Sequence, residues 1–287
     1  MLEHSYSFEA FGTQWSIETE KEMSQSLKEI IQNRIETFDA TYSRFRKNSL
    51  VTEISKLAGT YTFPTDADKL FSFYKQVYDI TSGKVTPLIG DMISRAGYDA
   101  TYSLKPQMQK PILSWNGAMK WSGVSLQTKE PIILDIGAAG KGYMVDIIVT
   151  ILDQNSIGEY VIDASGDLRH KGMSENKVGL EHPLDATKVI GIVNVKNKSL
   201  CASSSNRRSW GNGMHHIFDP DEMAPTNEII ATWVIADEAM VADGLATALF
   251  FTKPEKLRKT FDFEFARIHA NGSVEYSRYF ESGLFSS

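Results

Sequence analysis

Residues 133–146 read Ile-Leu-Asp-Ile-Gly-Ala-Ala-Gly-Lys-Gly-Tyr-Met-Val-Asp, and the rest of the chain is organised around this stretch. Its apolar beginning predicts a short strand that ends near Asp135, and the apolar run from Met144 onward has helical spacing. The small residues between them let a bound group approach the backbone, and a helix N-terminus attracts anions. Because Lys141 adds a positive charge, the stretch predicts a phosphate site, with glycines that serve only the turn geometry as the alternative.

Two familiar nucleotide motifs are excluded by the spacing of this stretch. A P-loop requires glycine, four residues and then Gly-Lys-Ser/Thr. Here Asp135 stands five residues before Gly140, and Gly142 follows Lys141. The spacing of a dinucleotide-binding turn is also absent, and no regular alternation of strands and helices surrounds the stretch.

The composition is that of a soluble globular protein, with 287 residues, 42% hydrophobic and 23% charged. This length predicts one domain over residues 1–287, with two intimately packed subdomains as the alternative. The predicted elements are rich in strands with few, non-alternating helices, which favours the α+β class. The net charge of −6 argues against binding to nucleic acid through bulk electrostatics.

Several sequence features bear on the compartment. The single cysteine, Cys201, excludes an internal disulfide, and no apolar run approaches the length needed to span a bilayer. The first residues contain no recognisable signal peptide. We therefore expect a cytoplasmic protein as the sequence stands, or an exported or membrane-anchored one from which a leader has been removed.

Three further segments carry structural predictions. Residues 5–18 alternate loosely and predict a half-buried strand, interrupted at Gly12 by a bulge or a close ligand approach. Residues 85–99 predict an irregular loop through apolar surroundings, which either lines a ligand or covers the core. Residues 229–237 predict another strand, rich in β-branched residues.

Residues 238–251 predict a buried, alanine-rich helix that contains Asp243 and Thr247. These two residues are four positions apart, so their oxygens share one face of the helix. A buried carboxylate needs a partner, and Mg²⁺ prefers oxygen ligands. The helix therefore predicts either a magnesium site or an aspartate that is hydrogen-bonded to a neighbouring loop.

Taken together, these pieces resemble the FAD:protein FMN transferase family, the ApbE-like flavin transferases, over nearly the whole chain. Six landmarks occur in the family's order, and their combination is far more specific than any one of them. They are Gly12-Thr13, Ser82-Gly83 with Pro87 and Gly90, Leu134-Asp135 through Asp146, Gly166-Asp167, His216-Ile217 with Asp219-Pro220, and Ala242-Asp243 with Ala246-Thr247.

The resemblance implies a fold and an activity. The fold would be the ApbE-like, T-fold-like arrangement of mixed and antiparallel sheets with packed helices. Such enzymes bind FAD and Mg²⁺, transfer FMN to a Thr or Ser hydroxyl of a target protein and release AMP. Two alternatives stay open: Mg²⁺-dependent FAD hydrolysis to FMN and AMP, and FAD binding without catalysis.

The resemblance also implies roles for individual residues. The metal would be held by Asp243, Thr247 and the backbone carbonyl of Gly140. His216 would be the base that deprotonates the acceptor hydroxyl, and Lys141 would contact the phosphates, so that His216, Lys141 and Asp243 form the catalytic set. The implied FAD-binding residues are Gly83, Lys84, Thr86, Tyr98, Lys141, Asp146, Ser165 and His216.

The chain departs from the family pattern in several loops. Thr86 stands where the family has a cofactor-contacting aspartate, Ser165 replaces a glycine, and Arg207 replaces a tyrosine. The chain contains no acceptor segment of the Asp-Gly-x-Ser/Thr-Gly-Ala-Thr type, so any flavin-acceptor protein is a separate partner. These departures make the fold and metal site firmer expectations than turnover.

Overall fold

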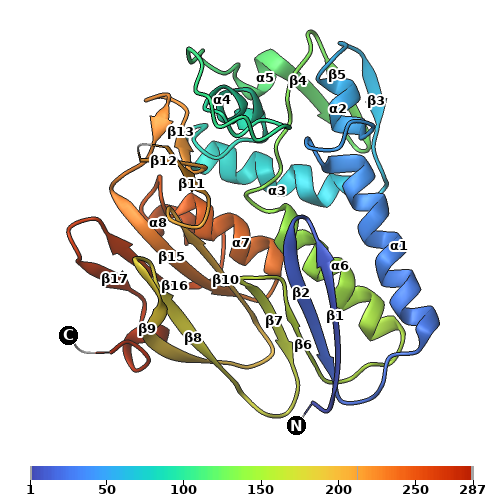
Figure 1. The fold of residues 1–287 in the computed structure, drawn as a ribbon, viewed down its shortest axis with the longest axis vertical. Helices are drawn as coiled ribbons and strands as arrows, with labels where there is room; N and C mark the ends of the chain where they lie inside the picture. The colour runs from blue at the N-terminus through green and yellow to red at the C-terminus, as the bar shows by residue number, and fades with distance from the viewer. Residues whose placement is uncertain (1, 212, 286–287) are drawn as a thin grey trace.

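An antiparallel sheet of eight strands forms the centre of the fold (Figure 1). The computed structural model describes residues 2–211 and 213–285. Every neighbouring pair of strands in the sheet runs antiparallel, which confirms the α+β class. In spatial order the strands are β1 (His4–Ala10), β2 (Thr13–Thr19), β6 (Tyr160–Asp163), β7 (Asp167–Lys171), β10 (Ser199–Ser204), β15 (Ile229–Ala236), β16 (Glu264–His269) and β17 (Val274–Tyr276).

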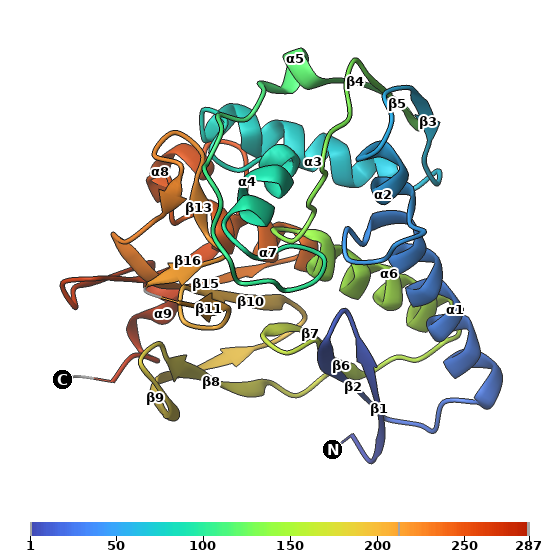
Figure 2. The same cartoon turned by 45° about the horizontal axis from the view of Figure 1, so that its top comes forward.

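Helices cover one face of this sheet in two tiers, as Figure 2 shows. Helices α6 (Gly140–Gln154) and α7 (Ala239–Ala248) pack directly on the strands and against each other. Helix α1 (Gln25–Tyr42) contacts α6, and helix α3 (Ala67–Ile80) contacts α7. The glycine-rich stretch and the Asp243 helix therefore lie side by side, although about a hundred residues separate them in sequence.

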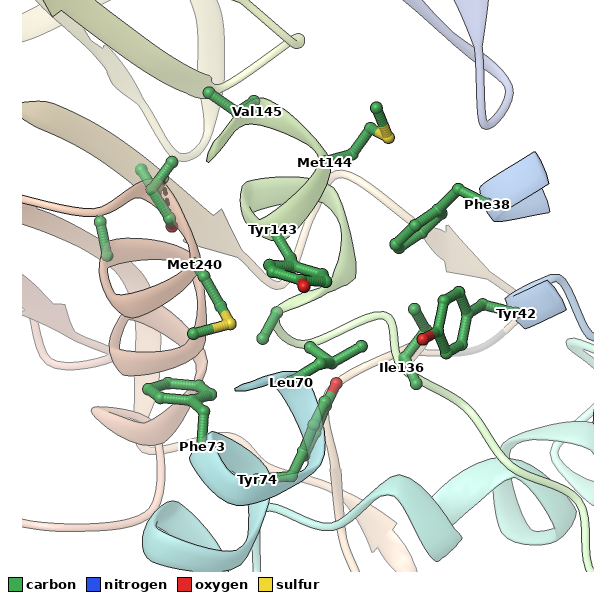
Figure 3. Close-up of a cluster of buried hydrophobic side chains, with 14 of the residues drawn as sticks. Phe38, Tyr42, Leu70, Phe73, Tyr74, Ile136, Tyr143, Met144, Val145 and Met240 are labelled. Carbon is green, nitrogen blue, oxygen red and sulfur yellow. Dashed lines mark hydrogen bonds between the residues drawn. The ribbon is translucent and has the colours of Figure 1, made fainter. Parts of the chain in front are cut away.

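The main hydrophobic core lies between these four helices. Figure 3 shows side chains of all four converging, with Tyr143 of α6 beside Leu70 of α3 and Phe38 of α1. On α7, Gly244 permits a close approach of α3, because a Cβ there would lie 2.3 Å from the ring of Phe73. Burial of these large apolar side chains fixes the mutual positions of the helices that carry the site.

A long hairpin covers the other face of the sheet. It is formed by β8 (Asn176–His182) and β9 (Asp185–Val195), and its inward side chains Leu180 and Val193 pack with Trp233 of β15 in a second core. Phe280 of the short helix α9 (Arg278–Glu281) completes this core.

The remaining elements lie above the helices or at the end of the sheet. One small sheet has the order β3-β5-β4. The bounds are α2 Leu50–Ile54, β3 Thr60–Thr62, α5 Trp115–Ala118, β4 Met119–Ser122, β5 Ser125–Thr128, β11 Ser209–Trp210, β12 Met214–His215, β13 Phe218–Asp219, β14 Ala224–Pro225 and α8 Pro254–Leu257. None of the described helices is both long and apolar enough to cross a bilayer.

The prediction of one strand over residues 5–18 is wrong, because this segment forms the hairpin β1–β2. Phe11 and Gly12 make its two-residue turn with φ of 52° and 70°, and Ala10 pairs with Thr13. Positive φ at both turn positions is typical of the tight hairpins that match strand twist. The interruption at Gly12 is therefore a chain reversal and not a bulge.

The prediction of a strand that ends near Asp135 is also wrong. Residues 131–136 join no sheet, and the Asp135 N–H donates to the Pro87 carbonyl at 2.8 Å. A Cβ on Gly90 would lie 2.4 Å from the Ile133 carbonyl oxygen, so Gly90 permits this close passage. Residues 131–136 thus pair with a loop and not with a strand. This pairing depends on the tertiary structure, and the apolar content of the segment does not reveal it. Helix α6 also begins at Gly140, earlier than the predicted Met144.

The predicted irregular loop over residues 85–99 is largely helical. It contains the 3-10 helix η1 (Pro87–Ile89) and the helix α4 (Gly90–Arg95). The Thr86 side chain accepts from the Leu88 N–H at 3.2 Å and so caps the first turn. The strand predicted at 229–237 is confirmed as β15, and the helix predicted at 238–251 is confirmed as the shorter α7.

Candidate active site

Two adjoining cavities of about 410 and 480 Å³ lie around the N-terminus of α6. The first, here called the carboxylate cavity, is lined by Asp167, Asp243, Thr247 and His216 among others. The second, here called the aromatic cavity, is lined by Phe11, Tyr42, Phe45, Tyr98 and Tyr102 among others. Each has the size of an ordinary small-molecule site, and together they could hold a ligand with two bulky ends.

Asp243 and Thr247 reach the carboxylate cavity from one face of α7. The Asp243 side chain is almost entirely buried, and its Oδ2 accepts the Gly142 N–H at 2.9 Å. A Cβ on Gly142 would lie 2.3 Å from the Ala239 carbonyl oxygen, so only glycine allows α6 to come this close. Gly142 thus allows α6 to pack closely against α7, the helix that carries the candidate metal ligands.

Asp146 lies one turn further along α6 and lines neither cavity. Its carboxylate accepts the N–H groups of Ala239 at 2.8 Å and Met240 at 2.9 Å. These are the first residues of α7, so Asp146 caps that helix. The expectation that Asp146 binds the cofactor is corrected: the residue positions α7, and burial raises its pKa to about 6.

Asp167, the first residue of β7, places a second buried carboxylate in the carboxylate cavity. Burial raises the pKa of Asp243 well above its usual range, and the charge of Asp167 raises it further. The ammonium group of Lys141 acts in the opposite direction. Two buried like charges near one another favour a cation between or beside them.

Lys141 lies in the first turn of α6 and lines both cavities. Its Nζ donates to the carbonyl oxygens of Ala164 at 2.8 Å and Ser165 at 3.0 Å. It also lies 3.2 Å from Oδ2 of Asp167. Carbonyl oxygens of the β6–β7 turn thus accept two hydrogen bonds from this ammonium group, and its charge forms an ion pair with the Asp167 carboxylate.

That turn itself requires unusual backbone angles. Ser165 and Gly166 have φ of 55° and 104°, a region that favours glycine. The Ser165 hydroxyl donates to the Gln14 carbonyl at 2.7 Å, which ties the turn to β2. Ser165 lines the carboxylate cavity, as expected for a binding residue.

The two adjacent histidines have different environments. His215 is hydrogen-bonded through both ring nitrogens, to the Thr226 carbonyl at 2.8 Å and the Ile217 N–H at 3.3 Å. His216 lines the carboxylate cavity, and its buried Nδ1 has no hydrogen-bond partner among the described residues. Burial and the charges of Arg208 and His215 lower the pKa of His216 to about 3, so its ring is neutral at neutral pH.

The segment after α3 contributes Lys84 and Thr86 to the carboxylate cavity, but not Gly83. Gly83 has a φ of 91° and donates its N–H to the Tyr78 carbonyl at 2.8 Å, so it terminates α3. The expectation that Gly83 binds the cofactor is therefore corrected. Lys84 bonds both oxygens of Asp219, at 2.6 and 2.8 Å, which joins this segment to β13 near His216.

Tyr98 lines both cavities and stacks on Trp210, with ring centroids 5.5 Å apart. Beside it, the buried Arg44 pairs with Asp135 and donates to the Tyr98 carbonyl at 2.9 Å. The Arg44 guanidinium also lies 4.2 Å from the centroid of the Phe45 ring. This cluster forms a preorganised wall of the aromatic cavity.

The structure thus gathers most of the predicted site. Gly140 lines the aromatic cavity and begins α6. Eight predicted residues line the carboxylate cavity, namely Lys84, Thr86, Tyr98, Lys141, Ser165, His216, Asp243 and Thr247. Within the described residues, no cluster of three or more His, Cys, Asp or Glu side chains is arranged for a metal, so any ion here needs hydroxyl or carbonyl ligands as well.

Sequence reasoning assigned no role to Asp167, Arg208 or the pair of Arg44 with Asp135. Asp167 carried a signal, because it belongs to Gly166-Asp167, one of the landmarks shared with the family. Arg208 carried none, since a basic residue in a polar loop is usually solvated. The ion pair joins residues 91 positions apart, which only the tertiary structure reveals.

The fold and the site together define a class: an α+β ligand-binding protein with a buried carboxylate centre next to an aromatic, nucleotide-sized cavity. The profile of the ApbE family matches residues 11–270. The chain belongs to the ApbE family.

Individual relatives agree with this assignment. The chain is 25% identical over 262 residues to an FAD:protein FMN transferase from Buchnera aphidicola, covering 83% of this chain and 76% of that one. It is 22% identical to the FAD:protein FMN transferase of Escherichia coli K12, covering 82% and 74%.

Solved structures share the fold. An ApbE protein from Thermotoga maritima superposes with a TM-score of 0.85 at 19% identity, covering 99% of each chain. A mutant of the flavin transferase ApbE from Vibrio cholerae superposes with a TM-score of 0.82 at 18% identity, covering 98% of this chain and 99% of that one. This similarity confirms the ApbE-like fold that the sequence resemblance implied.

Proposed function

We propose that this protein transfers FMN from FAD to a Thr or Ser hydroxyl of a separate acceptor protein and releases AMP. The observation that carries the proposal is the convergence of Asp243, Thr247 and His216 in one cavity that adjoins a second, aromatic one. FAD has two ring systems joined by a diphosphate, which suits two joined cavities. The named activity of the family's relatives supports the same assignment.

The residues present fit a magnesium ion. The Asp243 carboxylate is buried next to Asp167, and an Oδ2 of Asp167 is buried without a hydrogen-bond partner among the described residues. Asp243, the Thr247 hydroxyl and the Gly140 carbonyl would supply the oxygen ligands that Mg²⁺ prefers. When bound, Mg²⁺ would polarise the phosphoryl oxygens and neutralise developing charge.

His216 has the state that a general base needs. A neutral imidazole can take the proton of the acceptor hydroxyl, and the low pKa of His216 keeps it neutral. Its basicity rises when an anionic diphosphate enters the cavity, because nearby negative charge favours the imidazolium form.

The proposed reaction has a simple balance. The acceptor oxygen forms a bond to the phosphorus of the FMN half, and the bond from that phosphorus to the bridging oxygen breaks. The hydroxyl proton goes to His216, and AMP leaves with the bridging oxygen. Positioning and charge stabilisation supply most of the rate in such phosphoryl transfers.

The first experiment incubates the protein with FAD, with and without Mg²⁺, and with an acceptor peptide of the type named above. AMP and FMN are separated by chromatography, and flavin attached to the peptide is detected by mass. AMP with labelled peptide supports transfer, whereas AMP with free FMN means hydrolysis. Bound but intact FAD under all conditions would overturn the proposed activity.

A further inference from the structure

The boundary between the two cavities is the part of the site that the proposed function leaves without an assigned ligand contact. Five residues line both cavities: Tyr98, Asp135, Gly137, Lys141 and Arg208. Any molecule that occupies both cavities must pass these residues. In FAD the segment that joins the two ring systems is the diphosphate, which carries the negative charge.

Three of the five residues are charged, and two of them already have partners. The Asp135 carboxylate pairs with Arg44 and accepts the Gly137 N–H at 2.7 Å. Lys141 donates to two carbonyl oxygens of the β6–β7 turn and forms an ion pair with Asp167. Arg208 is exposed and makes no hydrogen bond or ion pair with its side chain in the described part of the chain.

The surrounding contacts hold Arg208 at this boundary. On one side, its neighbour Arg207 pairs with Glu181 at 2.7 Å. On the other side, the Trp210 indole donates to the Ala96 carbonyl at 2.9 Å and stacks on Tyr98. The loop is therefore anchored on both sides of Arg208, while the guanidinium itself stays available.

We propose that Arg208 binds the diphosphate of FAD at the boundary between the two cavities, in place of the contact that the family resemblance implied for Lys141. A guanidinium presents several donors in a planar fork, which suits two neighbouring phosphate oxygens. Arg208, His216 and Asp243 all line the carboxylate cavity, so a phosphate bound to Arg208 lies in the same cavity as the base and the metal ligand. This inference rests on the proposed use of FAD.

The test compares Arg208→Ala with Arg278→Ala, a matched change at an exposed arginine that lines neither cavity. Affinities for FAD and for riboflavin, which has no phosphate, are measured by flavin fluorescence in the presence of Mg²⁺. We expect Arg208→Ala to weaken FAD binding by about 10- to 100-fold and riboflavin binding by less than about twofold. Arg278→Ala should change neither by more than about twofold, and thermal melts confirm that both variants fold.

An equal loss for FAD and riboflavin in Arg208→Ala, or no loss for FAD, would overturn the inference. The outcome is separable from the proposed function: if the wild type binds FAD but releases no AMP, the transfer fails, yet the affinity comparison still decides on Arg208. Arg208→Lys provides a further check, because it keeps the charge but loses the fork, and FAD affinity should then fall between those of the wild type and Arg208→Ala.

Discussion

At the scale of single residues, the site depends on charges placed where burial makes them costly. Asp243 and Asp167 are 6% and 1% exposed, yet each carries a carboxylate. Lys141 partly compensates Asp167, and the remaining negative charge is available to a cation. Sequence reasoning identified Asp243 from its polar character within an apolar helix, but the mutual arrangement of the three charges depends on the fold.

Replacing Asp243 by asparagine separates the metal role from the structural one. Asparagine keeps an oxygen that can accept the Gly142 N–H but removes the buried charge beside Asp167. We expect Mg²⁺-dependent release of AMP to fall by at least about 100-fold, as for loss of a metal ligand. The melting temperature without Mg²⁺ should not fall, and its rise on adding Mg²⁺ should disappear.

Asp237→Asn is the control for this experiment, because that carboxylate is exposed and pairs with Lys198 at the surface. It should leave AMP release unchanged. AMP release by Asp243→Asn at the wild-type rate would contradict the metal assignment.

Replacing Lys141 by methionine tests whether this lysine holds the β6–β7 turn. The change leaves the buried Asp167 carboxylate without its cation, and we expect the free energy of unfolding to fall by about 3–5 kcal/mol. The measurement is urea denaturation, and Asp167→Asn in the same chain should restore most of the loss. A stable Lys141→Met variant that loses only FAD affinity would favour a phosphate contact for Lys141 instead.

At the scale of secondary-structure elements, the contact between α6 and α7 builds the site. Two positions one helical turn apart on α6 bind α7: Gly142 through its N–H to Asp243, and Asp146 through its carboxylate to the first residues of α7. The signature stretch is therefore rich in small residues for close helix packing as much as for ligand access. Asp146 resembled a binding residue in sequence because helix caps and ligand contacts use the same side chains.

Gly142→Ala probes this helix contact. The added Cβ would meet the Ala239 carbonyl oxygen at 2.3 Å and the Cβ of Asp243 at 2.7 Å, so α7 must shift away from α6. We expect a loss of about 1–3 kcal/mol in the free energy of unfolding and weaker Mg²⁺ binding, measured by denaturation and by calorimetric titration.

Gly158→Ala serves as the comparison, since its nearest neighbour would be the Glu20 carboxylate at an ordinary 3.5 Å. It should change the unfolding free energy and the Mg²⁺ affinity little. Equal effects of the two substitutions would show that tight packing at Gly142 has no special role.

At the scale of the whole molecule, the cavities are lined by residues from elements far apart in the chain. The carboxylate cavity alone includes Thr13 of β2, Lys84 after α3, Asp167 of β7 and Thr247 of α7. Trp233 of the second core also reaches this cavity. The sheet is shared by both cores, so we propose that residues 1–287 behave as one cooperative domain.

Calorimetry tests this cooperativity. We expect one unfolding transition without ligand, and a single transition moved upward by about 5–10 °C when Mg²⁺ and FAD are near 100 times their dissociation constants. The reason is that a ligand bound across elements of both cores stabilises them together. Two transitions, of which FAD shifts only one, would favour the alternative of two packed subdomains.

The sequence by itself determined the α+β class, the strand β15, the helix α7 and the family, because periodicity and short motifs are local properties of the chain. It also predicted Asp243, Thr247 and His216 as site residues, because their residue types match metal and proton chemistry. Each of these side chains lies in the carboxylate cavity.

Only the tertiary structure decided which polar residues serve packing and which face a ligand. Gly83 terminates a helix, Asp146 caps another and Lys141 holds a turn, whereas Arg208 lines the boundary of the two cavities. The physical reason is that the role of a polar group depends on the partners that neutralise it, and those partners lie far away in sequence.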